Sequence, residues 1–311
     1  MDRLDTAGSQ RRILLGLVSA AQATPFGREH DFRRIRTEAD FRRLVPLRTP
    51  AELQRAGAPS FLGDKGPLRA GRAAWQSALA FVMSVRPRRR LLSGPLMLLE
   101  DGVSSDAAGL PWLARAYAQS IRGDALGLLA RRSMTLLAGP ADGLIALVDE
   151  AQRLAGRDRI ADFWPGLTAI LYNRKRPAED AAPRLREAVG GDVLLLETCL
   201  LPNGPVGVED PRHGGLRLLC DHGAYFEFTP AAEAGKPDAT RHGPAEVEPG
   251  IVYETVLTSP AGAWACRTGV AVRFERRDPQ LFRLAEMPVP AAEPVRQVFT
   301  RPACPSPAPH R

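Results

Sequence analysis

Short, almost uninterrupted apolar runs recur through the middle of the chain. Four of them cover residues 96–99, 134–137, 168–172 and 193–196. Apolar residues occupy both odd and even positions in these runs, which is typical of strands that are buried on both faces. Helical stretches are predicted between them, at 141–154 and 181–189. This alternation of strand and helix predicts a parallel sheet covered by helices over residues 91–203.

The pattern changes after Gly204. Strands separated only by turns are predicted at 216–220, 224–228, 251–257, 264–274 and 281–285. Because no helix returns the chain between them, they favour an antiparallel β subdomain over residues 204–287. Prolines recur from 288 to 311, where they remove ladder donors, and we expect a disordered or loosely attached tail there.

Residues 1–90 are predicted to be mainly helical. Thr49 and Glu52 in Thr-Pro-Ala-Glu have the spacing of a capping box, with proline at the first helical position. A longer helix over 69–86 ends at a proline. The fold class predicted for residues 1–287 is therefore α/β, a large domain of helix-covered mixed sheets with an antiparallel C-terminal subdomain.

Composition bounds the class of protein. The chain has 311 residues, of which 44% are hydrophobic and 25% charged, with a net charge of +7. These values are typical of a soluble folded chain. Nearly all of the positive charge is arginine, and the densest arginine cluster, at 86–90, has no aromatic residues interleaved for base stacking, so we expect no nucleic-acid partner. No apolar run approaches the length of a membrane span, so we expect no membrane partner.

Four widely spaced cysteines predict neither a zinc site nor a disulfide framework. Reduced thiols favour a cytoplasmic location. A minor alternative is export, because Arg11 and Arg12 precede an apolar run that ends in Ala21-Gln22-Ala23, which resembles a secretory leader with its cleavage site. The same residues also fit one amphipathic helix.

Few residues point to catalysis. The sequence has no Walker-type loop, no nucleophile elbow and no histidine pair at metal-ligand spacing. His222 follows Asp221 and could serve acid–base chemistry, although a polar turn is the simpler interpretation. Glu197 ends an apolar run, and open parallel sheets bind ligands at the carboxyl ends of their strands, so Glu197 is a candidate ligand-binding carboxylate. A solvated strand end would explain a glutamate at this position equally well.

Seven segments, in order, resemble one known family. They are TPFGREH with FRRIRTEADFRRLVPLRTPAEL, RRRLLSGPLMLL, ADFWPGLTAIL, GGDVLLLET, GLRLLCDHGAYFEF, EVEPGIVYETVLTSPAGAW and VRFERRDPQLFRL. The chain thus resembles the auxin-responsive promoter family of acyl-amido synthetases, in its bacterial branch. The resemblance implies an adenylate-forming enzyme that converts ATP and a carboxylic acid to an acyl-adenylate, from which an amine displaces AMP. It also implies a smaller C-terminal domain, which would begin near residue 311.

The nucleotide motifs of that family are altered in this sequence. Its phosphate-binding Thr-Ser-Gly-Thr-Thr-Gly loop corresponds to FLGDKGPLRAGRAAW, where Lys65 is the only candidate phosphate contact. After Glu197 and Thr198, the adenine-stacking tyrosine corresponds to Cys199, and the magnesium-binding glutamate to Asn203, followed by Gly204. An amide is a weaker ligand for magnesium than a carboxylate.

Two further nucleotide elements differ. The Gly-Asp pair that holds the ribose hydroxyls corresponds to Gly269 and Val270, and valine offers no acceptor. A glycine-rich turn is replaced by residues that include Arg174, Lys175 and Arg176. We therefore expect a catalytically degenerate homologue without cofactors, which binds a small carboxylic acid or docks on another protein. The alternatives are a residual ligase, whose three basic residues hold phosphates of ATP with Mg²⁺, and a structural or decaying product without a ligand.

Overall fold

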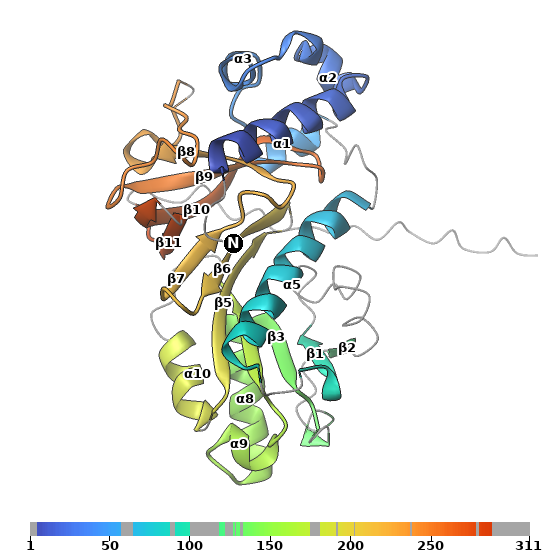
Figure 1. Cartoon of the computed structure of the whole chain (residues 1–311), viewed down its shortest axis with the longest axis vertical. Coiled ribbons are helices and arrows are strands. Elements are labelled where there is room, and N and C mark those ends of the chain that lie inside the picture. Colours follow the sequence, from blue (N-terminus) through green and yellow to red (C-terminus); the bar gives the residue numbers. More distant parts are fainter. Residues whose placement is uncertain are drawn as a thin grey trace, which may run out of the picture.

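A computed structural model describes most of the chain (Figure 1). The described residues are 5–56, 65–87, 91–99, 118–121, 127, 129–130, 133–174, 181–190, 192–201, 203–236, 238–277 and 280–287. The predicted tail at 288–311 lies outside them, as do Lys175 and Arg176. For residues 65–74, which include Lys65, only the backbone is described.

One mixed sheet runs through the molecule, in the order β2-β1-β3-β4-β5-β6-β7-β11-β10-β9-β8. Its parallel strands are β1 (Leu96–Leu99), β2 (Ala118–Ile121), β3 (Leu136–Pro140), β4 (Ala169–Asn173) and β5 (Leu194–Leu201). Its antiparallel strands are β6 (Gly204–Asp210), β7 (Gly215–Leu218), β8 (Tyr225–Pro230), β9 (Val252–Ser259), β10 (Ala263–Arg277) and β11 (Gln280–Ala285). The direction changes at β5, which pairs parallel with β4 and antiparallel with β6. The predicted α/β class with a mixed sheet is confirmed.

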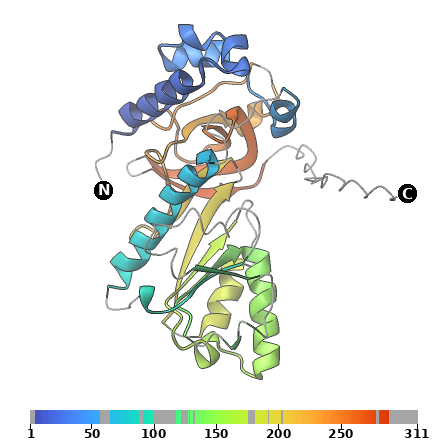
Figure 2. The ribbon, with the colours of Figure 1, turned by 90° about the vertical axis from the view of Figure 1, so that its right-hand side faces the viewer.

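Helices cover both faces of the parallel strands (Figure 2). On one face lie α8 (Ala141–Ala155), α9 (Ile160–Phe163) and α10 (Ala181–Val189), and on the other lies α5 (Lys65–Val85). Strand β1 shows the consequence, because Met97 and Leu99 pack with α8 while Leu96 and Leu98 pack with α5. This double burial explains why the sequence shows apolar runs without alternation.

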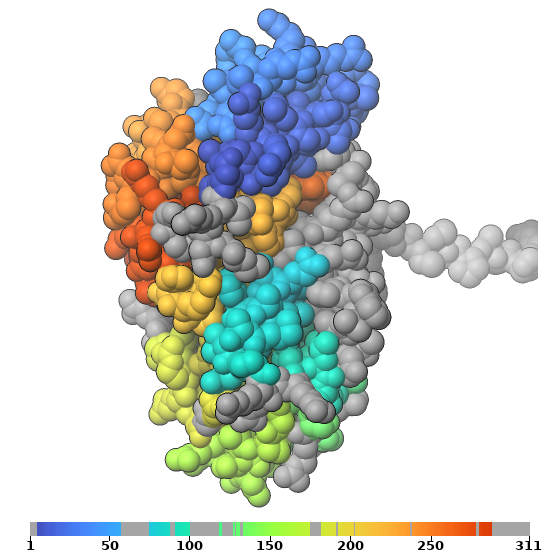
Figure 3. Space-filling view, in the orientation of Figure 1, coloured from blue at the N-terminus to red at the C-terminus, as the bar shows by residue number. Residues whose placement is uncertain are grey.

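The N-terminal helices pack on the antiparallel strands, as the space-filling view shows at one end of the molecule (Figure 3). They are α1 (Thr6–Ala21), α2 (Pro25–Glu29), α3 (Glu38–Leu44) and α4 (Pro50–Arg55), with a short 3-10 turn at Phe32–Arg34. Two further 3-10 turns, at Leu91–Ser93 and Ala231–Glu233, precede β1 and follow β8. The Thr49–Glu52 capping box predicted for α4 is present. A second capping box, between Thr37 and Asp40, starts α3.

The apolar run that resembles a secretory leader forms the buried side of α1. Leu14, Val18 and Ala21 are at most 3% exposed and pack against β8, β9 and β10. Within the described residues, no helix is both long enough and apolar enough to cross a membrane. The cytoplasmic location stays a prediction.

Candidate functional site

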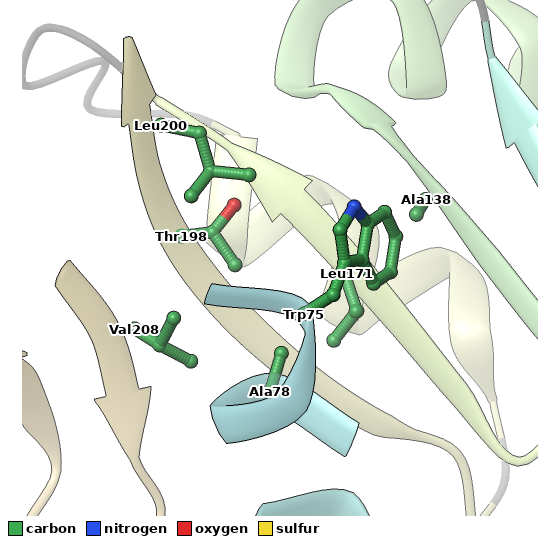
Figure 4. Close-up of a pocket in the computed structure, with 7 residues that line it drawn as sticks. All are labelled: Trp75, Ala78, Ala138, Leu171, Thr198, Leu200 and Val208. Carbon is green, nitrogen blue, oxygen red and sulfur yellow. The ribbon is translucent and has the colours of Figure 1, made fainter. Parts of the chain in front are cut away.

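A narrow apolar cavity lies where α5 crosses strands β3 to β6 (Figure 4). Its lining residues are Trp75, Ala78, Ala138, Leu171, Thr198, Leu200 and Val208. The indole of Trp75 reaches from α5 toward the strands and is only 5% exposed. The remaining volume is about 10 Å³, which admits one water molecule at most. Thr198, a residue implied by the resemblance to line the ligand pocket, therefore faces packed side chains.

Glu197 and Arg174 form an ion pair on the opposite face of the sheet. The Nε of Arg174 donates to Oε1 of Glu197 at 3.0 Å, and Nη2 donates to Oε2 at 2.6 Å. The two side chains are 17% and 13% exposed. Arg174, predicted as a phosphate contact, thus binds a carboxylate of its own chain, and Glu197 is not a solvated strand end.

Neighbouring groups reinforce this ion pair. The guanidinium of Arg174 also lies 6.0 Å from the centre of the Tyr172 ring. The backbone N–H of Glu197 donates to Oε2 of Glu209 at 2.8 Å. Burial, followed by the charge of Glu197, raises the pKa of the Tyr172 phenol. Burial also raises the pKa of the Glu209 carboxyl, although the hydrogen bond from the Glu197 backbone acts the other way. Their ionised forms are therefore disfavoured here.

The turn between β5 and β6 carries Asn203 and Gly204. The side-chain amide of Asn203 donates to Sγ of Cys266 at 3.8 Å, and the backbone carbonyl of Asn203 accepts a hydrogen bond from the Ser259 hydroxyl. Gly204 has φ +149°, and a Cβ there would lie 3.3 Å from Leu257. Asn203, for which the resemblance implies a magnesium-binding glutamate in the family, is therefore held against β9 and β10.

A bulge in β10 carries Gly269 and Val270. The register with β9 shifts between Arg267 and Ala271, and Gly269 adopts φ +69°, a left-handed conformation that favours glycine. Its N–H donates to Glu254 at 3.3 Å, and Glu254 also binds Arg267. Val270 is only 3% exposed and belongs to a hydrophobic core cluster. The position that corresponds to a ribose-binding aspartate thus points into the core.

Cys199 belongs to the same hydrophobic cluster as Val270 and is completely buried. The corresponding tyrosine of the family would need a ring face open to adenine, and this position has no exposed surface. The fold does bring Asn203 against Cys266 of β10, and Cys199 and Val270 into one core cluster, but as packed interior. Among the described residues, no group of three or more His, Cys, Asp or Glu side chains could hold a metal ion. The described side chains at these positions, Cys199, Asn203 and Val270, therefore do not fit ATP and Mg²⁺.

A second polar group lies outside these positions. Oγ of Ser77 is 2.8 Å from Nε2 of His222, whose Nδ1 contacts Oδ1 of Asp221. The sequence pointed to Asp221 and His222 but not to Ser77, which stands 145 residues earlier in α5. No local pattern signals this contact, because the turn after β7 brings the two segments together only in the folded chain.

Two segments match models of one family. Residues 3–55 match the GH3 family N-terminal domain, and residues 217–283 match the GH3 family central domain. A search of curated proteins finds no match.

Solved structures extend the likeness over nearly the whole chain. A structure of AtGH3.15 acyl acid amido synthetase in complex with 2,4-DB is similar over 90% of this chain and 68% of its own, with a TM-score of 0.64 and 15% identity. Another GH3.15 acyl acid amido synthetase structure gives the same coverage, with a TM-score of 0.62 and 16% identity. An open conformation of 2-hydroxyisobutyryl-CoA ligase covers 88% of this chain and 72% of its own, with a TM-score of 0.59 and 14% identity. Two segments of the chain thus match the GH3 N-terminal and central domain models, and its fold is the one shared by acyl acid amido synthetases and other adenylate-forming ligases.

Proposed function

We propose that this protein is a homologue of the acid-amido synthetases that is silent in adenylation and acts by docking on another protein. The observation that carries the proposal is the burial of Val270 at 3% exposure, where the family places a ribose-binding carboxylate. A nucleotide would have to displace core packing to reach this position.

Three positions lose their nucleotide contacts together. Val270 and Cys199 are buried among apolar side chains, and the Asn203 amide contacts Cys266. Adenylation needs donors and a cation around the triphosphate, because negative charge develops as pyrophosphate leaves. Because the partners of the metal, the ribose and the adenine are all replaced, restoring any one of these residues alone does not recover the reaction.

A small carboxylic acid is the second candidate ligand for this fold. The cavity beside Trp75 offers about 10 Å³, so an acid could enter only if the indole left its place. The filled cavity favours a protein partner over a small acid. The ligase alternative depends on Arg174, Lys175 and Arg176, of which Arg174 is already paired with Glu197. A structural product without any partner is the third possibility.

A pyrophosphate-release assay tests the proposal. The full chain is incubated with ATP, Mg²⁺ and a panel of carboxylic acids and amines, beside an active acid-amido synthetase. We expect no release above background from the natural chain, from Asn203→Glu or from Val270→Asp. Acid-dependent release by any of these three chains would reinstate the ligase alternative.

Docking needs a separate measurement. Crosslinking of the full chain in its native host, followed by purification of any captured protein and direct titration, should give saturable binding. Absence of any saturable partner in the titrations would favour the structural alternative.

A further inference from the structure

Three polar side chains meet between α5 and the turn that joins β7 to β8. Ser77 comes from α5, and Asp221 and His222 come from the turn. The Ser77 hydroxyl lies 2.8 Å from Nε2 of His222, and the other ring nitrogen contacts the carboxylate of Asp221. A hydroxyl, an imidazole and a carboxylate in this order are the parts of a nucleophile, its general base and the group that orients the base.

The turn that carries His222 is fixed from a third element. Gln10 of α1 donates to the carbonyls of Cys220 and Ala224, at 2.6 and 2.9 Å. Its Oε1 accepts from the N–H of Phe226 at 2.7 Å. These bonds bracket residues 221–223 on both sides, so the ring of His222 is presented to α5 by a held backbone. Such support is what keeps a reactive constellation in place.

The bonding pattern determines the proton positions. The hydrogen bond from His222 lowers the pKa of the Asp221 carboxyl. It outweighs burial, which acts to raise that pKa. An ionised carboxylate can only accept, so Nδ1 of His222 carries the hydrogen. In the neutral ring Nε2 is then the acceptor, and the Ser77 hydroxyl donates to it. This tautomer is the one that can take a proton from serine.

Ser77 differs from another serine of the same helix. Ser84 donates to the carbonyl of Phe81 at 2.8 Å, the usual local bond of a helical serine. Ser77 instead pairs with a ring nitrogen from a distant segment. The group also reaches the surface, because the side chains of His222 and Asp221 are 15% and 44% exposed. A Cβ at Gly223 would meet no heavy atom within 4 Å, so open space adjoins the backbone that follows His222.

We propose that Ser77, His222 and Asp221 form a serine acyl-transfer site that hydrolyses small activated carboxylic esters. Oγ of Ser77 bonds to the ester carbonyl carbon while its proton passes to Nε2 of His222. The bond from that carbon to the alcohol oxygen then breaks, and the alcohol leaves with the proton. Water attacks the acyl-serine in the same way and gives its proton to His222, which returns it to Ser77 as the acid is released. The sum is ester plus water to acid plus alcohol, without ATP or a metal.

The test uses the full chain with p-nitrophenyl acetate and a fluorophosphonate probe. Release of p-nitrophenolate should continue in EDTA and without ATP, and mass spectrometry of the labelled natural chain should place the phosphonyl group on Ser77. Ser77→Ala and His222→Gln should each lower the hydrolysis rate by about 10²-fold or more. Ser84→Ala, the matched control on the same helix, should keep the natural rate.

Labelling of the natural chain does not depend on the folding of any variant. A natural chain that neither reacts at Ser77 nor hydrolyses the ester faster than heat-unfolded chain would overturn the proposal. Equal hydrolysis rates for Ser77→Ala and the natural chain would overturn it as well.

Discussion

The guanidinium of Arg174 binds both carboxylate oxygens of Glu197, at 3.0 and 2.6 Å. The pair joins the end of β4 to β5, at the edge where open parallel sheets bind ligands. Side chains alternate along β5, so the next residue, Thr198, points to the other face, where Trp75 fills the cavity. At β4 and β5, described side chains of the chain itself therefore occupy both faces of the sheet at this end.

A double-mutant cycle should measure the ion pair. Glu197→Gln and Arg174→Gln each leave a poorly exposed charge without the opposite charge that pairs with it. The losses of stability in the two single variants should therefore sum to more than the loss in the double variant. We expect a coupling free energy of about 1–2 kcal/mol by urea unfolding. The exposed pair Asp149 and Arg184 gives a matched control, with coupling near zero. Equal coupling in the two pairs would mean that burial adds nothing at Arg174.

Val270→Asp should destabilise the protein by roughly 3 kcal/mol or more, because it places a carboxyl without a partner in the core. Burial raises the pKa of such a group above its unfolded value of about 3.9. The loss should therefore be smallest in acid and grow as the pH rises, since only the unfolded chain ionises freely. Urea unfolding at pH 4.5 and 8 measures this difference. Val270→Ala should show a smaller loss that does not change with pH, and a harmless Val270→Asp would indicate an open, wet pocket.

Trp75→Ala should open the cavity beside β4 and β5. Removal of a buried indole costs about 3–5 kcal/mol, and an apolar cavity left behind can bind an apolar ligand. Indole added at 100 times its dissociation constant should restore about 2.7 kcal/mol, seen as a rise in Tm. Trp75→Phe should lose less stability and gain nothing from indole. Failure of indole to stabilise Trp75→Ala would show that the site collapses.

Asp210 should stabilise the protein in a pH-dependent way. Its side chain is fully buried and accepts hydrogen bonds from Arg212 and Arg217. Burial acts to raise the pKa of Asp210, but these bonds hold it well below its usual range. A lowered folded pKa contributes stability above the unfolded value of about 3.9, and this is lost as the pH falls toward the folded value.

Asp210→Asn should therefore cost about 3 kcal/mol at pH 7 and progressively less as the pH falls below 4. Urea unfolding of both chains across this range checks the expectation, and Asp149→Asn, at an exposed pair, should change stability by less than about 0.5 kcal/mol. A constant difference between the Asp210→Asn and natural chains from pH 7 to 2 would contradict the role of its charge.

Much of the fold could be predicted from the sequence, because hydrophobic runs report burial directly. Strand β1 and helix α10 begin and end where the pattern predicts. Strand β6, in contrast, has the sequence GPVGVED, in which glycines and proline weaken any strand pattern. It forms because its neighbours β5 and β7 supply ladders on both sides. The sequence AQSI of β2 also lacks an apolar run, so no strand is predicted there, and β2 forms by pairing with β1.

The candidate site was less predictable because its contacts are tertiary. Glu197 was recognised as a strand-end carboxylate, but its partner Arg174 became visible only once β4 and β5 were paired. Trp75 fits the helical core pattern, and nothing in the local sequence indicates that its ring fills the cavity at β5. The contact between Ser77 and His222 likewise depends on how α5 packs against the β7–β8 turn.

The central claim is that the nucleotide site of this fold has become packed interior, and the melting temperature with Mg-ATP tests it most directly. A ligand raises stability only when its concentration exceeds its dissociation constant. We predict that millimolar Mg-ATP shifts the Tm of the full chain no more than the same ionic strength of magnesium chloride does. A clear, saturable rise with Mg-ATP, absent with the salt alone, would contradict the account and show that a nucleotide site survives.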